Sequence, residues 1–205
     1  MPLAHSLDSP SAGGLHVSES DREDDHPLFP GWRWAAVALA FPVAGLIGRA
    51  VGGDVDAVGA ALIGGALTGA GLGAAQWLAA RDMFGRWPVW VAASAGGYGV
   101  GLAAGAALVG YDTDLADLAL MGAVSGAVLG GAQGFALASQ RRSRLALAWT
   151  CAMPVLFAIG WSATTLAGID VDKQFTVFGA AGAVVFMLLS GLLLARHMPA
   201  QERVE

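Results

Sequence analysis

Long runs without charge are the feature that most restricts how this chain can fold. Five segments of about 20 residues or more contain almost no Asp, Glu, Lys or Arg, namely residues 55–80, 88–110, 115–138, 145–168 and 175–195. Each run is long enough to cross about 30 Å of hydrocarbon as an α-helix. A shorter run, 34–48, begins beside two tryptophans. The sequence therefore predicts an all-α integral membrane protein with six spanning helices.

The composition agrees with this fold and excludes several classes of function. Charged residues make up 13% of the chain, about half of the roughly 25% usual in soluble domains. The runs lack the apolar–polar alternation of a transmembrane β-barrel, so continuous helices are the remaining solution. No P-loop motif, basic surface or mid-span His, Lys or carboxylate is present in the sequence. We therefore expect no enzyme activity, no ATP-driven transport by this chain, no cofactor and no nucleic-acid partner.

The ends of the chain differ from the apolar region. Residues 1–30 are acidic, contain several serines and have no apolar run, a composition typical of disorder. We expect a disordered tail at 1–30, a six-helix domain at 31–197 and a short tail at 198–205. The single cysteine, Cys151, lies within the fifth run, and an inert packed thiol is the favoured interpretation.

Basic residues collect on one side of the predicted bundle. They are Arg33, Arg81, Arg86, Arg141, Arg142, Arg144 and Arg196. Because basic residues in short loops stay cytoplasmic, both termini are predicted to face the cytoplasm. Contacts with anionic lipid head groups are a second interpretation for three of them, Arg141, Arg142 and Arg144. Four tryptophans near the same side are predicted to be interfacial anchors, namely Trp34, Trp87, Trp90 and Trp149.

A period of 57 to 58 residues relates three parts of the chain. Three Asp-x-Asp frames recur every 58 residues, at Asp54/Asp56, Asp112/Asp114 and Asp170/Asp172. The leading glycines of the even-numbered runs recur every 57 residues, at Gly65, Gly122 and Gly179. A constant period of this size indicates an internal repeat. We therefore predict three parallel helical hairpins, at about 31–86, 87–144 and 145–197, around a pseudo-threefold axis.

Glycines recur every four residues along several predicted helices. They are Gly65, Gly69 and Gly73, then Gly122, Gly126 and Gly130, and finally Gly97, Gly101 and Gly105. Such stripes let helix backbones approach closely in lipid, and packing within one chain is favoured over homodimerisation. After Gly179, Ala183 and Met187 replace the next two glycines of the stripe. One face of the last helix should therefore pack less tightly or contact lipid.

The glycine stripe of the second run continues into a longer motif. It reads Gly65-x-x-x-Gly69-x-x-x-Gly73-x-x-Gln76-Trp77, and its copy from Gly122 ends at Gln133. These motifs resemble the repeated hairpins of a broad group of uncharacterised bacterial membrane proteins, over roughly residues 32–196. The chain departs from the pattern at Gly134, in place of Trp, and at Ser190, in place of Gln. The resemblance implies this fold and a bacterial inner membrane, and it implies no activity.

Three polar residues that share the period form the first candidate site. Gln76, Gln133 and Ser190 each lie eleven positions after the leading glycine, about 20° beyond three full turns of an α-helix. They should therefore form a polar ring on the glycine faces, flanked by Thr68 and Ser125. An interhelical amide clamp is the favoured interpretation. A solute pathway is the alternative, because polar groups at membrane depth often mark one.

The Asp-x-Asp frames form the second candidate site. Around a threefold axis, their six carboxylates could converge on a hard cation such as Ca²⁺, which takes about six to eight oxygen ligands. Helix capping is favoured over this metal site, because each frame precedes an even-numbered run. Arg49 lies within reach of Asp54 or Asp56 and is expected either to extend toward the aqueous interface or to form an ion pair with one of them.

Taken together, these patterns favour a structural role. Ion-coupled carriers generally keep ionisable groups near the middle of the membrane, and the predicted spans lack them. A compact scaffold or accessory subunit of an unknown membrane protein partner is therefore favoured. Permeation of a small solute or ion along the polar ring is the alternative.

Overall fold

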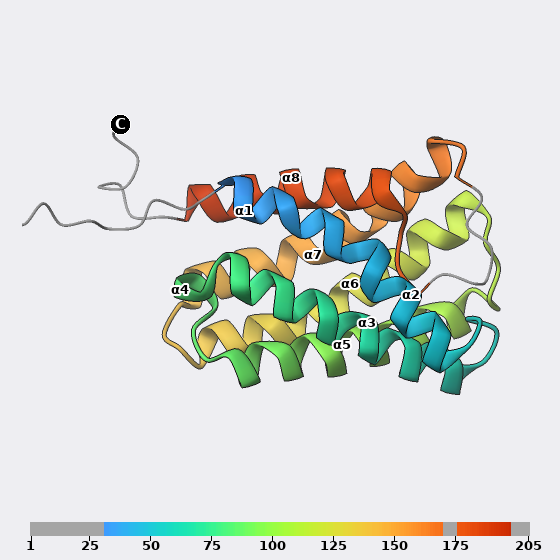
Figure 1. Ribbon diagram of the computed structural model, residues 1–205, viewed down its shortest axis with the longest axis horizontal. Helices are drawn as coiled ribbons and strands as arrows, with labels where there is room; N and C mark the ends of the chain where they lie inside the picture. Colours follow the sequence, from blue (N-terminus) through green and yellow to red (C-terminus); the bar gives the residue numbers. More distant parts are fainter. Residues whose placement is uncertain (1–30, 170–175, 198–205) are drawn as a thin grey trace, which may run out of the picture.

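The computed structural model describes residues 31–169 and 176–197 (Figure 1). All regular structure in these ranges is helical. The elements are α1 (Gly31–Ala36), the 3₁₀-helix η2 (Val37–Leu39), α2 (Ala40–Gly52), α3 (Val58–Ala79), α4 (Arg81–Phe84), α5 (Trp87–Leu108), α6 (Leu115–Ala138), α7 (Ser143–Leu166) and α8 (Ala180–Arg196). The expected tails at 1–30 and 198–205 lie outside the described residues, as do Asp170 and Asp172.

Within residues 31–169 and 176–197, five helical segments are long and apolar enough to cross a membrane. They are Gly31–Gly52, which combines α1, η2 and α2, then Val58–Phe84, Trp87–Leu108, Leu115–Ala138 and Ser143–Leu166. The sixth helix, α8, is apolar but has only 17 residues. The prediction of an all-α protein with transmembrane-type helices is therefore confirmed. The sixth predicted span is shorter than the sequence indicated.

The short length of α8 results from its late start. Gly179 is the N-cap of α8, whereas Gly65 and Gly122 lie one to two turns inside α3 and α6. The three residues before Gly179, Thr176 to Phe178, are not helical, yet all three are buried. Non-helical backbone is tolerated within a membrane bundle only where protein or a water-filled cavity surrounds it. Here the segment 176–179 is surrounded by protein, and it replaces the first turns of a helix.

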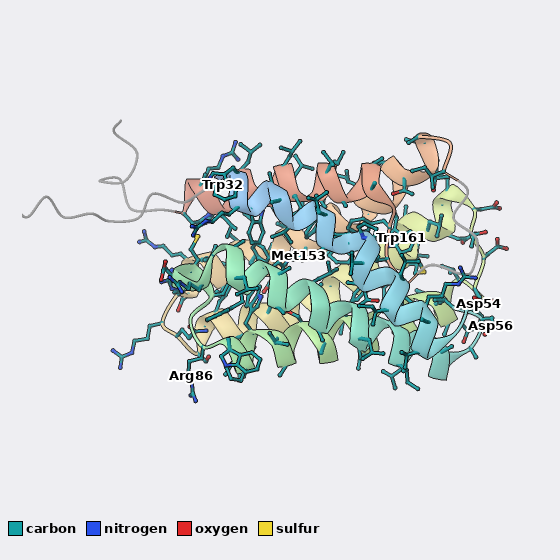
Figure 2. All side chains as sticks on the ribbon, in the orientation of Figure 1. Trp32, Asp54, Asp56, Arg86, Met153 and Trp161 are labelled. Atoms are coloured by element: carbon teal, nitrogen blue, oxygen red, sulfur yellow. The ribbon has the colours of Figure 1, made fainter. Side chains whose placement is uncertain are left out.

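The long helices run along the long axis of the molecule (Figure 1) and pack largely in chain order. The seams follow the sequence from α2 to α3, α5, α6, α7 and α8. Helix α8 returns to α1, η2 and α2, where its contacts are less extensive than those of the α3–α5 and α6–α7 seams. Figure 2 places Trp32 and Arg86 at one end of the bundle and Asp54 and Asp56 at the other.

The glycines of the predicted stripes lie at helix seams. Those of α3 face α5, those of α5 face α6 and those of α6 face α7. A Cβ atom on Gly69 would collide with the carbonyl oxygen of Ser94, and one on Gly126 with the carbonyl oxygen of Met153. In α8, Ala183 and Met187 are buried against protein. Of the two expectations for this face, looser packing or contact with lipid, the structure excludes contact with lipid at these two residues.

Aromatic side chains fill the interior in two clusters. The tryptophan cluster contains Trp34, Phe84, Trp90 and Trp149. The phenylalanine cluster contains Phe41, Tyr98, Phe157, Phe178 and Phe186. All nine side chains are buried, with relative exposures of 2% or less.

Burial corrects the expected role of three tryptophans. Trp34, Trp90 and Trp149 were predicted at the membrane interface, but they pack inside the bundle, where Phe84 stacks on Trp90 with ring centroids 3.9 Å apart. Of the four predicted anchors, only Trp87 is exposed. Trp32, two residues before Trp34 in the sequence, is exposed as well. Two of the buried indoles, those of Trp34 and Trp149, donate hydrogen bonds to side chains of other helices.

Candidate functional site

Gln76 of α3 and Gln133 of α6 lie together inside the bundle, with relative exposures of 4% and 1%. The Gln133 amide nitrogen donates to Ser94 Oγ of α5 at 2.9 Å. It also reaches Gln76 Oε1 over a longer 3.4 Å. The Gln133 carbonyl oxygen accepts a hydrogen bond from Trp149 Nε1 of α7 at 2.8 Å. Gln133 therefore connects four helices through one side chain.

Ser190 of α8 makes its hydrogen bonds elsewhere. The indole N–H of Trp34 donates to Ser190 Oγ at 3.1 Å, and this hydroxyl donates to the Met187 carbonyl oxygen at 3.3 Å. No hydrogen bond joins Ser190 to either glutamine in the part of the chain that the structure describes. The structure thus brings together two of the three polar residues, and the third pairs with a tryptophan.

Thr68 and Ser125 bond mainly to helix carbonyls. Ser125 Oγ contacts the Met121 carbonyl oxygen at 2.7 Å and that of Gly101 at 3.2 Å. Thr68 Oγ1 lies 3.3 Å from the Ala44 carbonyl oxygen and 2.7 Å from Thr176 Oγ1. Both side chains are fully buried. They hold the two helices of a hairpin together, and Thr68 also anchors the segment 176–179.

Tyr98 and Thr176 carry contacts that the sequence analysis does not predict. The Tyr98 hydroxyl donates to the Thr176 carbonyl oxygen at 2.6 Å, and Thr176 Oγ1 donates to the Gly45 carbonyl oxygen at 3.2 Å. Together with Thr68, these bonds tie the non-helical segment to α2, α3 and α5. The sequence contains no signal for them, because Tyr98 and Thr176 are 78 residues apart.

Ser94 was also missed, although one signal pointed to it. It lies four residues after Trp90, which places both residues on one face of α5. Its hydroxyl donates to the Trp90 carbonyl oxygen at 2.8 Å while accepting from Gln133. The Trp90 indole nitrogen itself is buried with no hydrogen-bond partner among the described residues, as is that of Trp161.

A small cavity of about 10 Å³ lies beside the two glutamines. Its polar lining consists of Gln76, Gln133, Ser94 and Tyr98, and the remaining lining is apolar or glycine. Four members of the phenylalanine cluster close one side, and Gln133 is bonded to Trp149 of the tryptophan cluster. The cavity therefore lies between the two aromatic clusters, and its polar groups are amides and hydroxyls.

The acidic turns do not come together in the described ranges. Arg49 Nε pairs with Asp54 Oδ1 at 3.1 Å, which confirms the expected ion pair. The carboxylates of Asp112, Asp114 and Asp117 lie within 4.8 Å of one another, and Asp54 and Asp56 are not part of this group. Two of the three grouped aspartates are exposed, as carboxylates without a ligand commonly are.

The prediction that the frames cap helices through their side chains is wrong where it can be examined. The N-cap of α3 is Ala57 and not Asp56. Asp114 occupies the N-cap of α6, but its carboxylate forms no capping hydrogen bond. The Asp112 carboxylate instead accepts from the Thr113 backbone N–H at 2.8 Å. Only the electrostatic attraction between these carboxylates and the helix N-termini remains.

Cys151 and Arg142 lie at the surface of the bundle. Cys151 is exposed on α7, so the expected packed thiol is corrected to an accessible one. Arg142 Nη2 donates to the Asp82 carbonyl oxygen at 2.6 Å, which joins the α6–α7 connection to α4.

Comparisons of this chain with protein-family models, with curated proteins and with solved structures found no match.

Proposed function

We propose that this chain is a non-enzymatic, multi-pass protein of the bacterial inner membrane that serves as a compact scaffold or accessory subunit. The packing of the bundle interior carries this proposal. Aromatic clusters occupy the interior on both sides of the buried glutamines, and the cavity between them measures about 10 Å³. Passage of a solute requires continuous space along the bundle, whereas a scaffold requires a rigid, well-packed interior.

The proposal includes three repeated hairpins around a pseudo-threefold axis. Two tryptophan–polar pairs support it, because Trp149 binds Gln133 of the preceding long helix and Trp34 binds Ser190 of the last one. The close approach of α3 to α5 and of α6 to α7 at equivalent glycines supports it as well. In this arrangement the glycine stripes act as zippers between neighbouring hairpins.

In the bilayer, the arginine-rich end of the bundle faces the cytoplasm in this proposal, with both termini on the same side. Arg141 and Arg142 in the α6–α7 connection and Arg144 in the first turn of α7 are exposed, and there they can contact anionic lipid head groups. The opposite end, with Asp54 and Asp56, faces outward. Fusion of a reporter enzyme after residue 197, compared with one inserted between residues 110 and 114, tests this orientation.

Copurification from native membranes tests the scaffold role. The tagged full-length chain should retain a membrane protein partner in fixed stoichiometry after solubilisation in a mild detergent. The purified chain, reconstituted in liposomes, should give no more flux of protons, K⁺ or small neutral solutes than protein-free liposomes. Absence of a partner together with specific flux would overturn the proposal.

Permeation of a small solute or ion is the second candidate function. The non-helical segment 176–179 inside the bundle favours it, because interrupted helices build the binding sites of many transporters. In this candidate function, the solute would pass the polar cavity at Gln76 and Gln133. Flux that is lost in Gln133→Leu while the protein stays folded, and kept in Gln140→Leu, would support this candidate.

A further inference from the structure

The hydrogen-bond network at the glutamines leaves one donor group, an amide nitrogen, without a partner in the network. An indole N–H can only donate, so Trp149 fixes the carbonyl oxygen of Gln133 on its own side. The Gln133 amide nitrogen must then face Ser94 and Gln76. Gln76 consequently presents its carbonyl oxygen to Gln133, because the opposite orientation would bring two NH₂ groups together. The Gln76 amide nitrogen is left pointing elsewhere.

This Gln76 amide nitrogen is a donor without a protein acceptor among the described residues, on a side chain that is itself buried and lines the cavity. Gln76 is 4% exposed, and no hydrogen bond from its Nε2 is formed within the described ranges 31–169 and 176–197. Buried amide groups are nearly always hydrogen-bonded to protein or to ordered water. The side chain lines the cavity of about 10 Å³, so a partner for the nitrogen must be sought there.

Several acceptors line the same cavity, and two of them belong to the glutamine network. Gln133 Oε1 accepts one hydrogen bond and has a second lone pair free. Ser94 Oγ donates once and accepts once, which also leaves one lone pair. A molecule between these groups would accept from Gln76 and donate to Gln133 or Ser94. It must therefore be both a donor and an acceptor.

The volume of the cavity indicates which molecule can occupy it. A buried water needs a cavity of roughly 10–15 Å³ and two to four polar partners, and this cavity measures about 10 Å³ with three partners. A cation such as Ca²⁺ takes about six to eight oxygen ligands, more than the lining supplies. We propose that Gln76, Gln133 and Ser94 bind a single ordered water, which completes the hydrogen bonding of the Gln76 amide and links α3 to α5 and α6. This inference does not depend on the scaffold role.

A crystal structure of the full-length protein, at a resolution that shows ordered waters, tests the site directly. We expect density about 2.7–3.2 Å from Gln76 Nε2 and at a similar distance from Gln133 Oε1 or Ser94 Oγ. In Gln76→Met, which keeps the length of the side chain and removes the donor, the density should be lost. In the control Gln140→Met, in the turn after α6, it should remain. A direct bond from Gln76 Nε2 to a protein acceptor, with no density in the cavity, would overturn the proposal.

Nuclear magnetic resonance gives a second readout that does not require the variant to fold. In wild-type protein labelled with ¹⁵N-glutamine, the assigned side-chain amide protons of Gln76 should show a cross-peak to water with the sign of a long-lived bound molecule. Those of Gln140, whose amide nitrogen is bonded to two backbone carbonyl oxygens, serve as the internal comparison. A dry cavity would give no such cross-peak at Gln76, and this result would refute the water site.

Discussion

A methyl group added at Gly126 should distinguish close helix packing from simple helix propensity. Gly126 lies at the seam between α6 and α7, where an added Cβ would collide with the Met153 carbonyl oxygen, and would lie 2.8 Å from the Met153 carbonyl carbon and 2.9 Å from Phe157 Cβ. Two of these atoms belong to the backbone of a packed helix and cannot move independently. The helices must therefore separate, and the bonds between Trp149, Thr150 and α6 must lengthen with them.

Helix α6 also supplies a matched control. Gly131 lies five residues further along, and an added Cβ there would meet nothing within 4 Å. Replacing a helical glycine by alanine at an open position stabilises by up to about 1 kcal/mol. Overpacking of a well-packed interior costs about 1–3 kcal/mol. We therefore expect Gly126→Ala to lower the free energy of unfolding by about 1–3 kcal/mol, and Gly131→Ala to leave it unchanged or raise it.

Unfolding in mixed detergent micelles with increasing dodecyl sulfate, followed by tryptophan fluorescence, measures both variants. The buried Trp90, Trp149 and Trp161 make this signal sensitive to loss of tertiary packing. A Gly126→Ala variant as stable as the wild-type protein would refute the reasoning, because it would show that the α6–α7 seam has room for a methyl group. A loss in Gly131→Ala as large as that in Gly126→Ala would refute it too.

Three further changes follow from the polar contacts and are measured in the same unfolding assay or by labelling. Gln133→Leu removes the hydrogen bonds to Trp149 and Ser94 and should lower the free energy of unfolding by about 1–2 kcal/mol. This is more than the average of about 0.6 kcal/mol for polar contacts between membrane helices, and an unchanged free energy of unfolding would contradict the connecting role of Gln133. Tyr98→Phe removes only the hydroxyl that holds the segment 176–179 and should cost about 1 kcal/mol, whereas unchanged stability would show that the bond is dispensable. Cys151 is exposed on an apolar span, so in folded protein a lipid-soluble maleimide should label it faster than a membrane-impermeant one, and resistance to both would contradict the exposure.

Most of the helices follow from the sequence because length and lack of charge are local properties. The run 115–138 matches α6, and the run 55–80 contains all of α3, which begins three residues after the start of the run. The start of α8 does not follow in this way. Thr176, Val177 and Phe178 are apolar or β-branched, and such residues suit a buried helix and a buried extended segment equally well. Only their partners in α2, α3 and α5 decide between the two, and those partners are distant in sequence.

The site was predictable in part for a related reason. The helical period places Gln76 and Gln133 on inward faces, and both are buried. Which group each one contacts depends on the lateral order of the helices, which a single sequence does not specify. Trp34 and Ser190 are 156 residues apart, and they meet only because α8 returns to α1. For the same reason the buried tryptophans were placed at the interface, since their nearness to loops was visible and their partners were not.

The departures of the last hairpin from the glycine pattern have a common physical explanation. In the two closely packed seams, glycines of α3 and α6 let the next helix approach until its backbone is in contact. The contact of α8 with α1 and η2 is less extensive, so a glycine there would leave space unfilled, and a void at a packed seam forfeits dispersion contacts. Met187 is buried, and Trp34 packs against Gly191 with its indole N–H directed to Ser190. A short polar residue suffices at 190 because the large indole brings its donor to the hydroxyl. The changes from Gly to Met and from Gln to Ser therefore accompany a seam in which a large side chain of α1, and not a helix backbone, meets α8 at Gly191 and Ser190.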